Sequence, residues 1–393
     1  MNEVIRIVGK CERRVWGLTG TERILRMLAT QGLTLQAGAP TPTVLLLRAD
    51  HIYDSRLLTA MAPAGDPFRL CAEATGPVVA ARVPREQLEA AATELAAGTG
   101  PTLDVLPARV PADLVSGFVK SLRKNEPPRV YNIAAADLQA LEMELFGGAY
   151  KGVTDLVTKW CWPPLAYRAT QVCVRLGLRP NHVTLFGLLL ALLATAAFAQ
   201  GSFGTGLIMG WFMTFLDTVD GKLARVTITA SRFGNYLDHG IDVIHPPIWY
   251  AAWGMGVAAQ WAEPMPLALV LWVMLFSYIG GRLCESAFHR FAGPFSVFVW
   301  RPLDSVNRLI TARRNPNLIL LTLFWLCGDP AGGLLAVALW HLASTLFLLL
   351  RVSYAISTRL RHGRLESWLA TVDPARDRSR LAVRMFTRAP AEL

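Results

Sequence analysis

The stretch FLDTVDGKLARVTITASRFGNYLDHGID, residues 215–242, decides the fold of the larger part of this chain. Its four aspartates lie in sequence that is otherwise membrane-like, although one aspartate near the centre of a spanning helix costs about 2.5–3.5 kcal/mol. Asp217 and Asp220 are three residues apart, so both lie on one helix face. Asp238 and Asp242, four residues apart, share a face of the next helix. Two helices that present paired carboxylates to each other predict an all-oxygen site for divalent cations such as Mg²⁺, Mn²⁺ or Ca²⁺.

The residues between the aspartates favour a phosphate-bearing ligand. Gly221 and Ala224 remove side-chain bulk after the first aspartate pair, where a flat ligand could approach the backbone closely. Arg225 supplies a positive fork suited to a phosphate or diphosphate. Gly234 clears the same face of the second helix. Together these features predict a nucleotide-diphosphate site.

The full pattern is Asp-x-x-Asp-Gly-x-x-Ala-Arg, eight residues, then Gly-x-x-x-Asp-x-x-x-Asp. It resembles the motif of the CDP-alcohol phosphotransferase family at every defined position. The resemblance implies transfer of a substituted phosphate group from a CDP-alcohol to a second alcohol, with release of CMP. It also implies that two ions, Mg²⁺ or Mn²⁺, are held by four carboxylates: Asp217, Asp220, Asp238 and Asp242.

The same resemblance implies further roles. Asp242 acts as the catalytic general base on the acceptor hydroxyl, as its position at the far end of the cluster permits. The nucleotide is bound by Asp217, Gly221, Ala224, Arg225 and Gly234. A rival of another class is a divalent-cation transporter that uses the intramembrane carboxylates. That rival leaves the glycine, alanine and arginine after the first aspartate pair unexplained.

Composition separates two regions. The 393 residues, with a formal net charge of +10 and 53% hydrophobic residues, allow two domains. Arginines interleaved with apolar helices indicate cytoplasmic loops, so no nucleic-acid partner is expected. The six cysteines form no CxxC motif and are interpreted as isolated reduced thiols. The N-terminus lacks the apolar core of a signal peptide, which predicts a cytoplasmic first domain.

Residues 1–147 alternate strands with helices, which predicts an α/β domain with a parallel, doubly wound sheet of the Rossmann type. The expected elements are a helix over 21–31, a strand over 43–48, a helix over 54–61, a strand near 78–83 and a helix over 84–97. Asp50 lies just beyond the carboxyl end of a strand, where such folds bind ligands.

This segment resembles sugar-nucleotidyltransferase domains, especially the inositol-phosphate cytidylyltransferases fused to a CDP-alcohol phosphotransferase. The matching pieces are GLTGTERILRML, VLLLRADHIYD and YNIAAADLQALEMELF. The expected glycine-rich nucleotide loop is absent, and Asn132 stands where that family has a second metal-binding aspartate. Asp50 alone would hold a metal poorly. We predict a degenerate domain with a structural or regulatory role; retained cytidylyl transfer is the alternative.

Residues 148–180 form a connector in which cations alternate with tryptophans and other apolar residues. This composition predicts an interfacial amphipathic helix whose cations, among them Lys159, reach lipid phosphates. An ordinary amphipathic linker helix would have the same composition. Asn181 can cap the first spanning helix. The resemblance places Asn181 and Thr184, from a Pro-Asn-x-x-Thr element, close to the nucleotide.

Hydropathy predicts a polytopic all-α membrane domain over residues 181–355. Its six transmembrane helices are expected at 182–199, 204–225, 232–258, 264–284, 316–328 and 332–353. Lysine and arginine avoid alternate loops, which places both termini and the aspartates on the cytoplasmic side of the inner membrane. Residues 356–393 are expected to form a basic cytosolic tail, with a short surface helix followed by disordered sequence.

The basic segment between the fourth and fifth spans flanks the predicted mouth of the site. Arginines at helix entries can hold a phosphate bidentately, and the resemblance implies an acceptor or headgroup phosphate against Arg282, Arg313 and Arg314. The topology rule alone also explains a basic inner loop. His239 and His245 neighbour the carboxylates and are interpreted as packing or hydrogen-bonding residues rather than metal ligands.

The sequence therefore predicts an integral-membrane transferase of phospholipid or polyol-phosphate (inositol-type) biosynthesis. One reading has CDP-diacylglycerol as donor and inositol phosphate or glycerol phosphate as acceptor. The other has CDP-inositol or a similar CDP-polyol as donor and a lipid or polyol-phosphate acceptor, which the fused first domain favours by analogy. Membrane lipids are expected partners, and the resemblance implies a homodimer.

Overall fold

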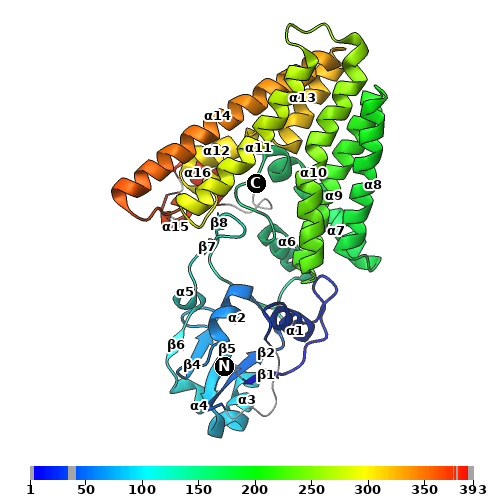
Figure 1. The fold of residues 1–393 in the computed structure, drawn as a ribbon. Coiled ribbons are helices and arrows are strands. Elements are labelled where there is room, and N and C mark those ends of the chain that lie inside the picture. The colour runs from blue at the N-terminus through cyan, green and yellow to red at the C-terminus, as the bar shows by residue number, and fades with distance from the viewer. Residues whose placement is uncertain (1–3, 34–40, 375, 378, 388–393) are drawn as a thin grey trace. The chain divides into compact units, whose positions relative to one another are not determined.

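The computed structural model describes residues 4–33, 41–374, 376–377 and 379–387. Contacts divide the chain into two compact units. The first comprises Met1–Val119, Glu126–Gly148 and Arg225–Ala230, and the second comprises Lys120–Asn125, Ala149–Ala224 and Ser231–Leu393. The first unit is α/β and the second is helical, as the sequence predicts (Figure 1).

A five-stranded sheet forms the centre of the first unit, in the order β1-β2-β5-β4-β6. The strands are β1 (Val4–Val8), β2 (Thr43–Arg48), β4 (Phe68–Cys71), β5 (Val78–Pro84) and β6 (Ala108–Arg109). β5 is antiparallel to both neighbours, whereas β1–β2 and β4–β6 are parallel pairs. The prediction of a parallel, doubly wound sheet is therefore wrong. Residues 72–77, which join β4 to β5, are too few for the crossover that parallel neighbours need.

Helices cover both faces of this sheet. They are α1 (Gly20–Thr30), α2 (Ser55–Met61), α3 (Leu88–Ala97) and α4 (Pro101–Asp104). Leu45 and Leu47 of β2 join one buried cluster with residues of α1 and α2. Val44 and Leu46 join a second cluster with residues of α3 and α4. β2 is apolar along its whole length because successive side chains point to opposite, equally covered faces.

Smaller elements complete the first unit: β3 (His51–Tyr53), η1 (Arg85–Gln87), α5 (Pro111–Leu114), β7 (Phe118–Val119), β9 (Val130–Asn132) and α6 (Leu138–Gly148). β3 pairs with β9 in antiparallel register. The start of α1 is fixed by a capping box, in which Thr19 Oγ1 accepts from the Glu22 amide at 3.2 Å and Glu22 Oε2 accepts from the Thr19 amide at 2.8 Å.

Six long helices of the second unit coincide with the six predicted spans. They are α8 (Pro180–Ala199), α9 (Phe203–Val226), α10 (Arg232–Val257), α11 (Leu267–Phe291), α13 (Arg314–Leu326) and α14 (Pro330–His362). Among the described residues, α8, α11 and α14 are long and apolar enough to cross a membrane. α9 and α10 carry the aspartates, and α13 has 13 residues, about 20 Å of helix. The count of six spans stays a prediction.

Aromatic side chains join these helices. Phe198 and Phe203 pack against Trp253, with ring centroids 5.0 and 4.5 Å away. The Trp253 indole donates to the Pro330 carbonyl at 2.8 Å, and the Trp249 indole donates to the Ala191 carbonyl at 3.0 Å. Each buried indole N–H thus has an acceptor, which ties α10 to α8 and to the start of α14.

The remaining elements of the second unit are short. They are β8 (Lys124–Asn125), the π-helical turn η2 (Val157–Cys161), α7 (Pro163–Arg175), η3 (Ala258–Gln260), η4 (Val297–Val299), α12 (Pro302–Ile310), α15 (Trp368–Thr371) and α16 (Leu381–Phe386). Exposed Leu165 and Val172 give α7 an apolar outer face, and exposed Leu176 follows directly after the helix. Lys159 departs from the expected role of reaching lipid phosphates. It is 1% exposed, and its ammonium donates to the Gly152 carbonyl at 2.9 Å.

The expected disordered tail is also corrected in part. α14 continues to His362, and beyond it Leu369 and Phe386 are fully buried. The Asn125 amide donates to the carbonyls of Leu369 and Val372 at 2.8 and 3.0 Å, which holds α15 in place. Residues 375, 378 and 388–393 of this tail lie outside the described residues.

Candidate functional site

The aspartates of α9 and α10 converge. Asp217, Asp238 and Asp242 each offer a carboxylate oxygen, and the three oxygens lie within 4.8 Å of one another. Among the described residues this is the one group of acidic, histidine or cysteine side chains arranged to hold a metal ion. Its donors are hard oxygens of the kind that Mg²⁺ and Mn²⁺ prefer, so the residues present fit a divalent cation.

Asp220 is not one of these three residues. Its carboxylate is 4% exposed and accepts a hydrogen bond at 2.5 Å from Thr184 Oγ1, on the second turn of α8. Sequence reasoning grouped Asp220 with the other three aspartates as a metal ligand and placed Thr184 near the nucleotide. The structure brings these two side chains together.

The starts of α8 and α10 approach closely. Ser231 caps α10, its Oγ accepting from the Gly234 amide at 2.9 Å. A Cβ atom on Gly234 would lie 2.7 Å from Asn181 Oδ1 and 3.0 Å from Ser231 Oγ. The sequence suggested that Gly234 makes room for a ligand. In the structure it also makes room for Asn181.

Arg314, the first residue of α13, reaches the carboxylates directly. Its Nη1 donates to Asp242 Oδ1 at 2.7 Å, and its Nη2 forms an ion pair with Asp217. The arginine side chain is 14% exposed. Sequence reasoning assigned Arg314 to an acceptor phosphate, but here its guanidinium is a counter-charge for the cluster. Because a buried carboxylate group needs compensating charge, Arg314 occupies a place that suits a cation.

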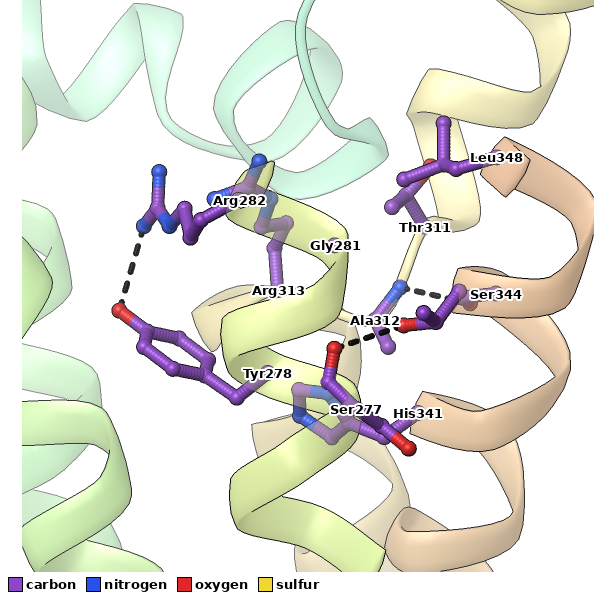
Figure 2. Close-up of a pocket in the computed structure, with 11 residues that line it drawn as sticks. Ser277, Tyr278, Gly281, Arg282, Thr311, Ala312, Arg313, His341, Ser344 and Leu348 are labelled. Atoms are coloured by element: carbon purple, nitrogen blue, oxygen red, sulfur yellow. Dashed lines mark hydrogen bonds between the residues drawn. The ribbon is translucent and has the colours of Figure 1, made fainter. Parts of the chain in front are cut away.

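Arg282 and Arg313 line a pocket between α11, α14 and the segment 311–313 that precedes α13 (Figure 2). The other lining residues are Ser277, Tyr278, Gly281, Thr311, Ala312, His341, Ser344, Thr345 and Leu348. Arg282 Nη2 donates to the Tyr278 hydroxyl at 3.4 Å, and that hydroxyl donates to the Val243 carbonyl of α10 at 2.8 Å. Tyr278 therefore links this pocket to the residue that follows Asp242.

Sequence reasoning missed two residues that interact with these arginines, Glu285 and Tyr278. Arg313 forms an ion pair with Glu285 of α11, and Arg282 lies over the Tyr278 ring at 5.4 Å. Tyr278 and Arg282 are four residues apart on α11, so their pairing was readable as neighbours on one helix face. Glu285 carried no such signal, because its partner is on another helix.

The other predicted site residues are less tightly defined. Ala224 is half-buried near the end of α9, and Gly221 lies one residue after Asp220. Arg225 is exposed and falls within the first unit. The imidazole of His245 contacts the Ile241 carbonyl at 2.6 Å and the Trp249 ring at 4.8 Å, as expected for a packing residue.

Asp50 of the first unit is engaged by its neighbours. Arg48 Nη2 donates to Asp50 Oδ2 at 2.7 Å, and His51 Nδ1 lies 2.6 Å from Oδ1. Burial alone would raise the pKa of Asp50, but these contacts outweigh it and hold the pKa well below its usual range. Asn132 Oδ1 accepts from the amides of Ala134 and Ala135 at 2.9 and 3.2 Å. Both side chains thus serve local structure.

Comparison with known proteins finds a match in the helical region. Residues 178–350 match the family model of the CDP-alcohol phosphatidyltransferases. The matched residues include the four aspartates and overlap the region over which the sequence predicts a membrane domain.

Individual relatives cover different lengths. An archaetidylinositol phosphate synthase of Pyrococcus horikoshii is 41% identical over 76 residues, which are 19% of this chain and 40% of that protein. A phosphatidylinositol phosphate synthase of Mycolicibacterium smegmatis is 29% identical over 212 residues, 52% of this chain and 88% of that protein. A cholinephosphotransferase 1 of Xenopus laevis is 30% identical over 142 residues, 33% and 34% of the two chains. The chain thus spans two fifths or less of two of these three relatives.

Among solved structures, the chain is similar to the Mycobacterium tuberculosis phosphatidylinositol phosphate synthase crystallised with CDP-DAG bound. The identity is 20%, the TM-score is 0.36, and the match covers 48% of this chain and 94% of that one.

Proposed function

We propose that this protein is an integral-membrane CDP-alcohol phosphotransferase that moves a substituted phosphate group to a second alcohol and releases CMP. The observation that carries the proposal is the convergence of Asp217, Asp238 and Asp242 from α9 and α10, within residues 178–350 that match the family. The rival reading, a divalent-cation transporter, has no comparable support from the comparisons.

In the proposed reaction, divalent metal ions would neutralise negative charge, and aspartates of the chain would hold these ions. Divalent metal ions serve this family, and bound Mg²⁺ or Mn²⁺ would neutralise the diphosphate and the departing CMP. Asp217, Asp238 and Asp242 would hold an ion directly. We propose that Asp220, fixed by Thr184, completes a site for two ions. The number and identity of the ions belong to the proposal.

Asp242 is proposed as the general base. It takes the proton of the acceptor hydroxyl while the hydroxyl oxygen forms a new bond to phosphorus. The bond from phosphorus to the CMP oxygen breaks, and CMP leaves with the electron pair. Gly221, Ala224, Arg225 and Gly234 are proposed to seat the nucleotide, with Asn181 at the start of α8.

Arg282 and Arg313 are proposed to receive a phosphate of the acceptor or of its headgroup. Both line the pocket in Figure 2, and Tyr278 connects that pocket to α10 beside Asp242. Arg314 is proposed to act at the boundary between the two sites. Its guanidinium can pair with carboxylates, as here, or with a phosphate once cations occupy the cluster.

The names of the relatives suggest substrates. Two are synthases of inositol-containing lipid phosphates, which favours a lipid CDP donor and an inositol phosphate acceptor. The name cholinephosphotransferase supports the second reading, a polar donor group and a lipid acceptor. We propose a protein of the inner membrane with its site facing the cytoplasm. A homodimer through the exposed apolar helix faces is part of this proposal.

The test is to offer the purified full-length protein a panel of CDP-alcohols with Mg²⁺ or Mn²⁺ and to measure CMP. We expect release from one donor class, and loss of turnover in Asp242→Asn with nucleotide binding retained. Metal flux into liposomes with no CMP release from any donor would favour the transporter. Pyrophosphate release from CTP and a polyol phosphate would show that the first unit retains cytidylyl transfer.

A further inference from the structure

The loop between the two aspartate helices belongs to the first unit. Contacts group Arg225–Ala230 with the N-terminal α/β domain rather than with the helices on either side. Two arginines of α1 hold its backbone. Arg23 Nη1 donates to the Val226 carbonyl at 2.9 Å, and Arg26 Nη1 donates to the Thr227 carbonyl at 2.8 Å.

Because Arg23 is buried, its guanidinium depends on the hydrogen bond to the Val226 carbonyl. Its residue is 5% exposed, and its guanidinium also donates to the Val15 carbonyl at 3.4 Å. Burial lowers the pKa of Arg23 to about 10, with a further lowering from neighbouring Arg26. A buried guanidinium needs acceptors for its N–H groups, and the loop carbonyl is its shorter described contact.

Ile228 anchors the loop through its side chain. Its φ is +52°, a left-handed conformation that is strained for a β-branched residue. The side chain packs against the buried cluster that includes Ile24, Met27 and Leu45. A strained backbone persists only where the surroundings hold it, so packing on this cluster explains the conformation.

This loop is the only covalent link between the two carboxylate pairs. Asp220 lies five residues before it begins, and Asp238 lies eight residues after it ends. The segment contains the last two residues of α9, which ends at Val226, and precedes α10, which begins at Arg232. The position of the loop therefore constrains the last turn of α9 and the first turn of α10.

We infer that the first unit works as a clamp on the α9–α10 loop, and that Arg23, Arg26 and Ile228 are positioning residues for the aspartates. The inference rests on the proposed function for its effect on turnover, but not for the clamp itself. It gives the N-terminal domain a role that requires no catalytic residue of its own.

The clamp is tested first without any substrate. The bond between Arg225 and Val226 is a trypsin site whose second residue is 2% exposed. We expect Arg23→Met and Ile228→Gly to speed cleavage of this bond by roughly tenfold, because local opening exposes it. Mass spectrometry would identify the fragment ending at Arg225. Arg6→Met is the matched control, since Arg6 is in the same unit and pairs with exposed Glu89.

The positioning role is tested by turnover. Misplacement of reacting groups by about 1 Å can cost on the order of a hundredfold in rate. We expect both variants to lower kcat by roughly tenfold to a hundredfold and to raise the Mg²⁺ concentration needed for half-maximal CMP release. Arg23→Lys keeps a positive charge and N–H donors at this position, so its kcat should lie between those of Arg23→Met and wild type.

The outcomes separate the two ideas. Unchanged trypsin cleavage in both Arg23→Met and Ile228→Gly overturns the clamp, whatever the activity. Faster cleavage with wild-type kcat and Mg²⁺ dependence overturns the positioning role. If wild-type protein releases no CMP from any donor, the proposed function fails, while the cleavage result still decides the clamp. Ile228→Gly alters the loop side alone, so misfolding of Arg23→Met would not remove the test.

Discussion

The Cβ atom that Gly234 lacks would lie 2.7 Å from Oδ1 of Asn181, closer than such atoms approach in proteins. The two residues belong to the first turns of α10 and α8. Gly234 lies one turn before Asp238, and a side chain at position 234 would displace the Asn181 amide at the start of α8.

Gly234→Ala should therefore displace the Asn181 amide, which is proposed to lie at the nucleotide, and lower CMP release by about tenfold. Gly240→Ala is the matched control on the same helix, because a Cβ there meets nothing within 4 Å. In an open helical position alanine stabilises by roughly 0.5–1 kcal/mol, so Gly240→Ala should keep its activity and melt no earlier. Equal activity of the two variants would contradict this account of Gly234.

Thr184→Val tests the hydrogen bond to Asp220. Valine keeps the shape of threonine but leaves the buried carboxylate without this donor, a loss of about 1–3 kcal/mol. We expect weaker binding of Mg²⁺ and nucleotide, measured by titration of the purified protein. Thr195→Val on the same helix is the control, because that hydroxyl bonds only locally to the Ala191 carbonyl. A similar loss in both variants would assign the effect to α8 stability instead.

Arg314→Met tests whether a guanidinium and a metal ion share the carboxylate cluster. Removing the arginine leaves Asp217 and Asp242 without a described ion-pair partner, so the repulsion between the neighbouring carboxylates is no longer compensated. In EDTA the melting temperature should fall. Added Mg²⁺ should raise it more than in wild type, because the ion supplies the missing charge.

The control for Arg314→Met is Arg351→Met. Arg351 also holds a buried aspartate, Asp304, with Nε at 2.6 Å from the carboxylate, but no metal-type cluster is formed there among the described residues. It should lose stability with no extra response to Mg²⁺. An equal rise of the melting temperature with Mg²⁺ in both variants would contradict the prediction that Arg314 and a metal ion share the carboxylate cluster.

Lys159 gives a pH dependence. Burial lowers its pKa to about 8 from 10.5, so between these values the folded protein binds fewer protons than the unfolded chain. The free energy of unfolding then rises with pH across that window, by up to about 1.4 kcal/mol per pH unit. Lys159→Met lacks this contribution. The melting temperature of wild type minus that of the variant should therefore increase from pH 7.5 to about 10; a constant difference would contradict the buried ammonium.

Sequence reasoning located the six long helices of the second unit because hydropathy and length are local properties. It also placed the aspartates on facing surfaces, because spacings of three and four fix a helix face. It could not identify Arg314 as the partner of Asp242, since 72 residues separate them and no spacing rule reaches across helices. For the same reason the ion pair of Arg313 with Glu285 went unseen.

Composition misled where one pattern has two physical outcomes. Lysines alternating with tryptophans occur both in helices that reach lipid headgroups and in buried turns, and Lys159 belongs to the second kind. Strands alternating with helices suggested a parallel sheet. The link between β4 and β5 is too short for the crossover that parallel neighbours need, and these two strands pair in antiparallel fashion. The contacts of Val226 and Thr227 with α1 could not be predicted from the sequence, because they join residues about 200 positions apart.

Ile228 also bears on how the protein is made. The ribosome completes the strands and helices of the N-terminal domain long before residue 228 emerges, so the domain first exists with one piece of its core still unsynthesised. That piece arrives only after α8 and α9 have been translated. Completion of the first unit therefore waits for translation of α8 and α9, and an N-terminal fragment that ends at residue 148 would lack the contact of Ile228 with its buried cluster.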